Sequence, residues 1–116
     1  TFLKANFNVD IVNIFMTLKR GAWKADLWRL CKLYINSGIY SDVDIEPFLE
    51  LNTLDTDVTF YSCIAAGGAA IFQAFIVNFS KPKNALILAC LVYFLQNKDS
   101  NGFNWPTNNM YDLLHL

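Results

Sequence analysis

The longest uninterrupted pattern in this chain is a run of twenty-two residues, 58–79, without a charged side chain. A short break at 80–83 separates it from a second uncharged stretch, 84–97. In a globular protein, a helix that is apolar on all sides is a central one wrapped by amphipathic neighbours. The pattern therefore predicts an apolar central helix over about 58–79, packed by a helix over 84–97. Gly67 and Gly68 in its middle indicate a kink or a split, or a place where another backbone approaches closely.

Two amphipathic helices are predicted before this region. Apolar residues at spacings of three and four indicate a helix over 8–20, with Asn8 as its N-cap, although its β-branched residues leave a strand over 9–15 as an alternative. A second helix over 22–36 has one apolar face and ends at Ser37-Gly38. With short helices over 47–52 and 108–116, the sequence predicts an all-α fold, a small single-domain bundle of five or six helices over 1–116.

The uncharged run is also long enough to cross a bilayer, which requires about 20 apolar residues in a helix. A membrane or lipid-associated helical hairpin is therefore an alternative. The return segment 85–95 is only eleven residues long, which is short for a second crossing. The amphipathic helices at 8–36 also need a core to cover, so the buried centre is favoured.

Length and cysteine content support this interpretation. A chain of 116 residues can form a hydrophobic core without metal or disulfide cross-links. The three cysteines, Cys31, Cys63 and Cys90, are an odd number and match no zinc-binding spacing. They are expected to be buried free thiols in a reducing compartment. With no signal-peptide pattern at the first residues, this predicts a cytoplasmic location.

Charge is divided between two zones of the chain. Residues 1–40 carry six bases and two acids, whereas residues 41–57 carry six acids and no base. The acids are Asp42, Asp44, Glu46, Glu50, Asp55 and Asp57. Such a segment can steer and bind a basic partner. The alternatives are a solvated loop, or an internal partner for the basic zone.

The basic zone contains a second candidate surface, formed by Arg20, Lys24, Trp28, Arg29 and Lys32. A tryptophan flanked by bases on a helix resembles an interface anchor or a stacking platform for nucleic-acid bases. In the alternative interpretation another helix covers Trp28, and the lysine side chains extend around it to solvent.

Catalytic groups are not apparent in the sequence. The single histidine, His115, is the penultimate residue, so no Ser–His–Asp or Cys–His set can be assembled. The carboxylate pairs Asp42/Asp44, Glu46/Glu50 and Asp55/Asp57 lie in a polar, turn-rich segment and lack the spacing of a calcium loop. We therefore predict no catalytic residue, no metal and no cofactor, and a protein that is not an enzyme.

The function predicted from these features is that of a non-catalytic protein-binding module. The most specific form is a stoichiometric inhibitor of the immunity or antitoxin type, which occludes a basic toxin or nuclease with the acidic segment. Nucleic-acid binding through the basic surface is the alternative, disfavoured by the net charge of −1. A homo-oligomer is compatible with each of these functions.

Overall fold

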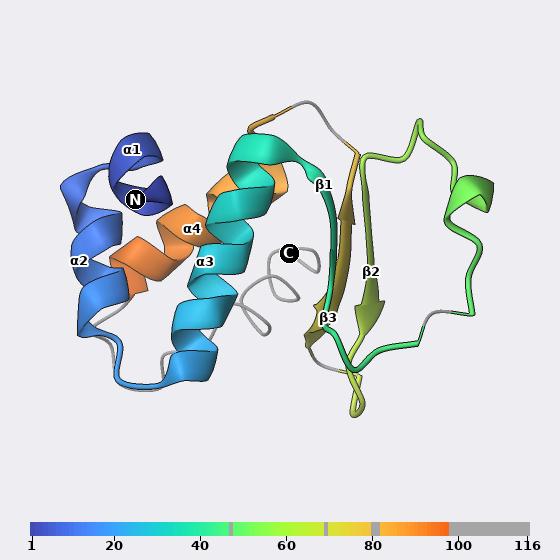
Figure 1. The fold of residues 1–116 in the computed structure, drawn as a ribbon, viewed down its shortest axis with the longest axis horizontal. Coiled ribbons are helices and arrows are strands. Elements are labelled where there is room, and N and C mark those ends of the chain that lie inside the picture. The colour runs from blue at the N-terminus through green and yellow to red at the C-terminus, as the bar shows by residue number, and fades with distance from the viewer. Residues whose placement is uncertain (47, 69, 80–81, 98–116) are drawn as a thin grey trace.

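The computed structural model describes residues 1–46, 48–68, 70–79 and 82–97, which form helices and an antiparallel sheet (Figure 1). The helices and strands, in chain order, are α1 (Phe2–Asn6), α2 (Val9–Thr17), α3 (Gly21–Asn36), β1 (Gly38–Ser41), the 3₁₀ helix η1 (Leu51–Thr53), β2 (Phe60–Ile64), β3 (Ile71–Asn78) and α4 (Ala85–Asn97). The predicted all-α bundle is therefore wrong. The fold is mixed, with α-helices packed on a three-stranded sheet.

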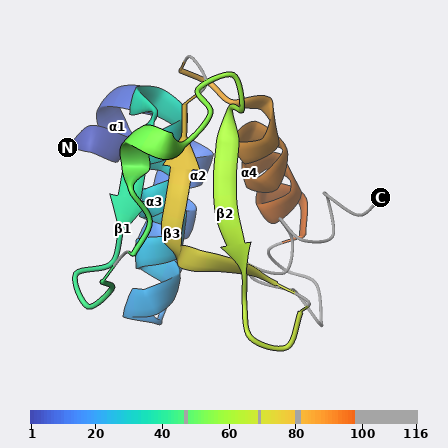
Figure 2. The ribbon, with the colours of Figure 1, turned by 90° about the vertical axis from the view of Figure 1, so that its right-hand side faces the viewer.

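The helices gather on one face of the sheet, which has the strand order β1-β3-β2 (Figures 1 and 2). α3 packs against both β1 and α4. The core between these layers includes Leu27 and Leu30 from α3, Ile76 from β3 and Phe94 from α4. The segment that joins β1 to β2 runs on the side away from the helices (Figure 1).

The uncharged run 58–79 forms a β-hairpin and not the predicted central helix. Gly67 and Gly68 have positive φ angles of 98° and 79°, a conformation that glycine adopts without steric cost. Two hydrogen bonds close the turn: the N–H of Ala65 donates to the carbonyl of Ala70, and the N–H of Gly68 donates to the carbonyl of Ala65. The glycines thus reverse the chain direction. The aromatic and β-branched residues on either side favour strands.

The three longest helices confirm predictions from the sequence. The helix predicted over 8–20 is α2, which ends at Thr17, and the Asn8 side chain accepts a hydrogen bond from the N–H of Ile11 as its N-cap. The helices predicted over 22–36 and 84–97 are α3 and α4. Ser37 and Gly38, both with positive φ, end α3 as expected.

The two short helices fare differently. In place of a helix over 47–52, the structure has η1 at Leu51–Thr53, while Pro47 lies outside the described residues. The helix predicted over 108–116, together with His115, also lies outside them. Among the described residues, the structure has no helix of sufficient length and apolarity to span a bilayer.

β3 bends sharply near its middle (Figure 2). Ser62 on β2 pairs with Ile76, but the next residue, Cys63, pairs with Phe72, so the register jumps across three residues of β3. The bend lies beside the end of β1, where Ser41 pairs with Phe75. It therefore brings Gln73 near the residues that follow β1.

Candidate functional site

Asp42 and Asp44 lie in a turn directly after β1. The N–H of Asp42 donates to the carbonyl of Ala74 on β3 at 2.8 Å, which extends the sheet by one pair. The carbonyl of Asp42 accepts a hydrogen bond from the N–H of Ile45 at 3.3 Å, which closes a four-residue turn. Val43 and Asp44 in this turn are exposed. The end of the strand thus holds two carboxylates, two residues apart.

Arg29 on α3 lies beneath this turn and is only 7 % exposed. Its Nη1 donates to Asp26 Oδ1 at 2.8 Å, one turn earlier on the same helix. Its Nη2 donates to the Tyr40 hydroxyl at 3.1 Å and lies 3.7 Å from Asp42 Oδ1. The guanidinium therefore links α3 to the end of β1.

Tyr40 completes the connection between Arg29 and Asp42. Its hydroxyl donates a hydrogen bond to Asp42 Oδ1, and the Arg29 guanidinium carbon lies 4.2 Å from the centre of its ring. Burial raises the pKa of Tyr40 above its usual value; the hydrogen bond to Asp42 raises it further, while Arg29 opposes this. The Asp42 carboxylate is consequently fixed in orientation, although 37 % of its side chain is exposed.

Three buried polar atoms near this turn have no hydrogen-bond partner among the described residues. They are Arg29 Nε and both amide atoms of Gln73, Nε2 and Oε1. Buried polar groups in folded proteins are nearly always paired, with protein, water or a ligand. Arg29 Nε belongs to the guanidinium beside Asp42, and Gln73 is the neighbour of Ala74, whose carbonyl accepts the Asp42 N–H.

A second pair of aspartates with the same spacing, Asp55 and Asp57, has a different environment. Asp55 Oδ1 accepts a hydrogen bond from the N–H of Asp57 at 2.9 Å, a local turn contact. Both residues are exposed, and neither forms an ion pair within the described part of the chain. These carboxylates lack the basic and hydroxyl groups that orient Asp42.

The six acids proposed as one partner-binding face are thus unequal. Asp42 is paired with Arg29, so at this point the acidic segment contacts the basic zone inside the molecule. The other five are exposed: Asp44, Glu46, Glu50, Asp55 and Asp57. Binding of a basic partner by these residues stays a prediction.

The basic side chains of the second candidate surface lie in two kinds of environment: one is buried, and the others lie over aromatic rings. Arg29 is buried, whereas Arg20, Lys24 and Lys32 lie over the rings of Trp23, Phe15 and Phe2. Trp28 is 39 % exposed, and its ring packs edge-on against Phe2 of α1. Trp28 is thus in contact with α1 but not covered by it, and binding through this surface stays a prediction.

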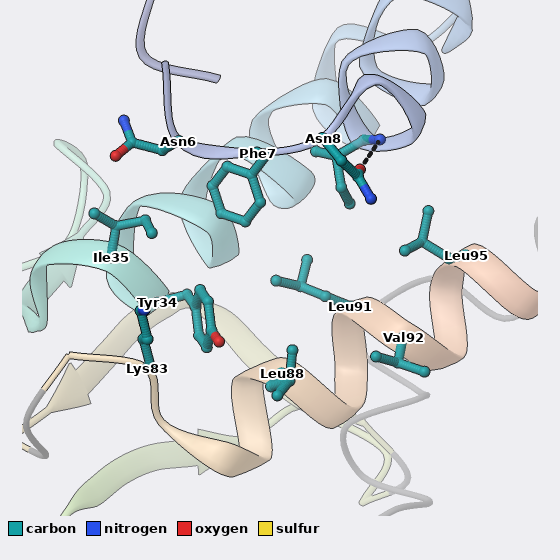
Figure 3. Close-up of a pocket in the computed structure, with 11 residues that line it drawn as sticks. Asn6, Phe7, Asn8, Tyr34, Ile35, Lys83, Leu88, Leu91, Val92 and Leu95 are labelled. Carbon is teal, nitrogen blue, oxygen red and sulfur yellow. Dashed lines mark hydrogen bonds between the residues drawn. The ribbon is translucent and has the colours of Figure 1, made fainter. Parts of the chain in front are cut away.

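Two hollows lined by described residues are mainly apolar. The larger, of about 410 Å³, lies between α4 and the α1–α2 junction and is lined mainly by apolar side chains such as Ile11, Leu88 and Leu91 (Figure 3). It reaches Tyr34, more than one turn beyond Arg29 on α3, and so belongs to another part of the molecule. A smaller one, of about 200 Å³, lies between Ile45, Leu49, Cys63, Phe72 and Phe75.

Protein side chains alone do not form a metal centre here. Among the described residues, no three His, Cys, Asp or Glu side chains lie close enough together to hold an ion. The cysteines are free thiols; Cys31 and Cys90 are buried as predicted, but Cys63 on β2 is exposed.

Comparison with known proteins gives one match. Residues 1–64, more than half of the chain, match the family model described as the glycosyltransferase sugar-binding region containing DXD motif. The chain belongs to this family. Comparison with curated proteins and with solved structures gives no significant match.

Membership of the glycosyltransferase sugar-binding family overturns two predictions. The chain was expected not to be an enzyme, and the family is one of enzymes that transfer sugars. The predicted inhibitor of a basic toxin or nuclease is wrong for the same reason. Both predictions treated the acidic segment 41–57 as a solvated face without catalytic groups.

The matched residues contain two Asp-X-Asp sequences, Asp42-Val43-Asp44 and Asp55-Thr56-Asp57. All four aspartates were among the candidate residues predicted from the sequence, whereas Asp26, Tyr40 and Gln73 were not. Two features of the sequence point to the Asp42-Val43-Asp44 turn and its neighbours. One is a pair of carboxylates directly after the run Gly38-Ile39-Tyr40, and the other is an acid and a base three residues apart on the preceding helix.

Proposed function

We propose that this chain holds the donor-binding site of a glycosyltransferase, and that Asp42-Val43-Asp44 binds the phosphate groups of an activated sugar. The observation that carries the proposal is the Asp42 carboxylate, oriented by Arg29 and Tyr40 at the end of β1 within the matched region.

The residues fit a divalent cation shared with the donor. Mg²⁺ sites in phosphate-binding enzymes use one or two carboxylates together with substrate phosphate oxygens. Asp42 and Asp44 supply two such carboxylates, and the absence of a third nearby acid among the described residues leaves positions for phosphate. The cation would offset the charge of the donor's phosphates, which increases on the leaving group as the sugar is transferred.

The chain's own groups contribute orientation and charge. Tyr40 fixes one oxygen of Asp42, and Arg29 supplies a permanent positive charge close to that carboxylate. Arg29 is itself held by Asp26. A guanidinium held in place in this way can stabilise negative charge that develops during the reaction without having to move.

The test is equilibrium dialysis of the full 116-residue chain against UDP-glucose, UDP-galactose, UDP-N-acetylglucosamine and GDP-mannose, with and without Mn²⁺. We expect saturable, Mn²⁺-dependent binding of at least one of these donors. The double variant Asp42→Asn/Asp44→Asn should weaken that binding by about tenfold or more, because the amides no longer attract the cation.

The matched control is Asp55→Asn/Asp57→Asn, which removes the same charge from the same spacing on the exposed segment. We expect it to bind the donor as the unaltered chain does. Equal losses from the two double variants would contradict the assignment of the site. A complete lack of donor binding with Mn²⁺ would contradict the proposed function.

A further inference from the structure

Gln73 is only 6 % exposed, yet neither polar atom of its amide has a hydrogen-bond partner among the described residues. Burial of an unpaired amide disfavours the folded state. An apolar residue of the same size would avoid this cost. The amide therefore requires an explanation other than packing.

The fold places this amide on the same face of the sheet as the Asp42 carboxylate. Phe72 lines the small hollow with Ile45, whereas Ile71 belongs to the core beneath the helices. Gln73 is buried like Ile71, two positions earlier on β3, whereas Phe72 between them is exposed, which indicates that Gln73 shares the core face with Ile71. The Asp42 carboxylate contacts Arg29 of α3 and so lies on the same face.

The two residues are also close along the sheet. Asp42 donates its N–H to the carbonyl of Ala74, the residue next to Gln73. Arg29 Nε, the third unpaired atom, belongs to the guanidinium that contacts Asp42. Three unpaired polar atoms thus lie on one face of the structure, around the end of β1.

The hydrogen-bonding requirements of these atoms indicate which part of the activated sugar can pair with them. Nε2 of Gln73 needs a hydrogen-bond acceptor, and Oε1 needs a hydrogen-bond donor. Phosphate oxygens offer only acceptors, and a cation would satisfy only Oε1. Sugar hydroxyl groups both donate and accept, so two neighbouring hydroxyls can pair with both atoms of the amide.

We propose that Gln73 binds hydroxyl groups of the donor's sugar and so helps to select which sugar is accepted. The inference rests on the proposed function and assigns a role to a residue outside the range 1–64 that matches the family. Both amide atoms are enclosed in this structure. Sugar binding therefore requires the Gln73 side chain, or those above it, to rotate.

The experiment compares a nucleotide sugar with its nucleoside diphosphate, both with Mn²⁺. The probes are the donor that binds best in the dialysis panel and the matching UDP or GDP. Gln73→Leu should weaken binding of the nucleotide sugar about tenfold and leave the nucleoside diphosphate unchanged, because only the sugar contact is lost. Gln73→Asn, which retains an amide, should bind the nucleotide sugar more tightly than Gln73→Leu.

Folding is checked by thermal unfolding of each variant. Gln73→Leu should unfold at the same or a higher temperature than the unaltered chain, because an unpaired amide has been removed. Gln96→Leu makes the same change at an exposed site on α4 and should leave both affinities unchanged.

The outcomes separate the two proposals. If the unaltered chain binds no nucleotide sugar, the proposed function fails. If it binds one, and Asp42→Asn/Asp44→Asn abolishes binding while Gln73→Leu binds as before, only the role of Gln73 is overturned. Equal weakening of nucleotide sugar and nucleoside diphosphate by Gln73→Leu would also overturn it, because the effect would not depend on the sugar.

Discussion

At the scale of single residues, the proposed donor site depends on the hydroxyl group of Tyr40. This group accepts a hydrogen bond from Arg29 and donates one to Asp42, so it connects a buried guanidinium to a partly exposed carboxylate. A hydrogen bond to a charged group contributes more than one between neutral groups. Removal of the hydroxyl should therefore affect both stability and the orientation of Asp42.

Tyr40→Phe tests this, because it keeps the ring on which Arg29 packs and removes only the oxygen. We expect the free energy of unfolding to fall by about 1–2 kcal/mol, as measured by urea denaturation. Mn²⁺-dependent donor binding should weaken at the same time. Tyr61→Phe is the control, because its hydroxyl donates only to the carbonyl of the exposed Asp55; an equal loss of donor binding there would contradict the role of Tyr40.

The residues of the site show how far sequence reasoning reached. The sequence predicts Asp42 and Asp44 as a carboxylate pair in a loop or turn, and they do lie in a turn, but the strand before them was not predicted. Tyr40 was missed because β1 has only four residues, too few for a clear alternating pattern. Without β1, nothing in the sequence indicates that Arg29 and Asp42, thirteen positions apart, are in contact.

At the scale of elements, helices with clear amphipathic patterns were predicted correctly, and the uncharged run was not. A buried strand and a buried helix segment have the same uninterrupted apolar composition, so periodicity cannot separate them. From the sequence, Gly67 and Gly68 were expected to kink or split a helix. In the structure they form the turn of a β-hairpin. The hairpin they produce places Gln73 beside the end of β1.

A second buried amide on β3, that of Asn78, has hydrogen-bond partners for both its nitrogen and its oxygen and links the sheet to α3 and α4. Its Nδ2 donates to the carbonyl of Leu33 on α3 at 3.0 Å, and its Oδ1 accepts from Asn84 Nδ2 at 3.1 Å. Asn84 in turn accepts hydrogen bonds from the N–H groups of Leu86 and Ile87 at the start of α4. One fully buried side chain thus joins the sheet to two helices.

Asn78→Leu should lower the free energy of unfolding by about 2–4 kcal/mol, because the Leu33 carbonyl and the Asn84 amide lose their partner while buried. Urea denaturation measures the change. Gln73→Leu is the matched comparison, since it replaces a buried amide of the same strand that has no partner among the described residues. Similar destabilisation by both substitutions would contradict the distinction between paired and unpaired amides.

At the scale of the whole molecule, the site lies where the helical layer meets the end of a sheet strand. Most of the helical layer was predicted from the sequence, but the sheet was not; binding of a basic partner by the acidic segment stays a prediction. The single-domain organisation, the cytoplasmic location and the homo-oligomer expected from the sequence stay predictions. None of them changes the contacts between Arg29, Tyr40 and Asp42.

We expect the core joining these layers to make the fold less stable at alkaline pH. Burial raises the pKa of Cys31 and of Cys90 from 9.0 to about 12, and also raises the pKa of Tyr40. Above pH 9 the unfolded chain releases thiol protons that the folded chain retains, so the unfolded state binds fewer protons. Stability is therefore full below pH 9 and falls as the pH rises toward 12.

Each buried thiol should lower the free energy of unfolding by up to about 1.4 kcal/mol per pH unit across this range. The measurement is urea denaturation under reducing conditions from pH 7 to pH 11. Cys31→Ala/Cys90→Ala should be less stable at pH 7, because two core side chains are shortened, but its stability should fall less steeply with pH. Cys63→Ser, at an exposed position, should retain the slope of the unaltered chain. A slope unchanged in the double variant would show that the buried thiols do not set the alkaline limit of the fold.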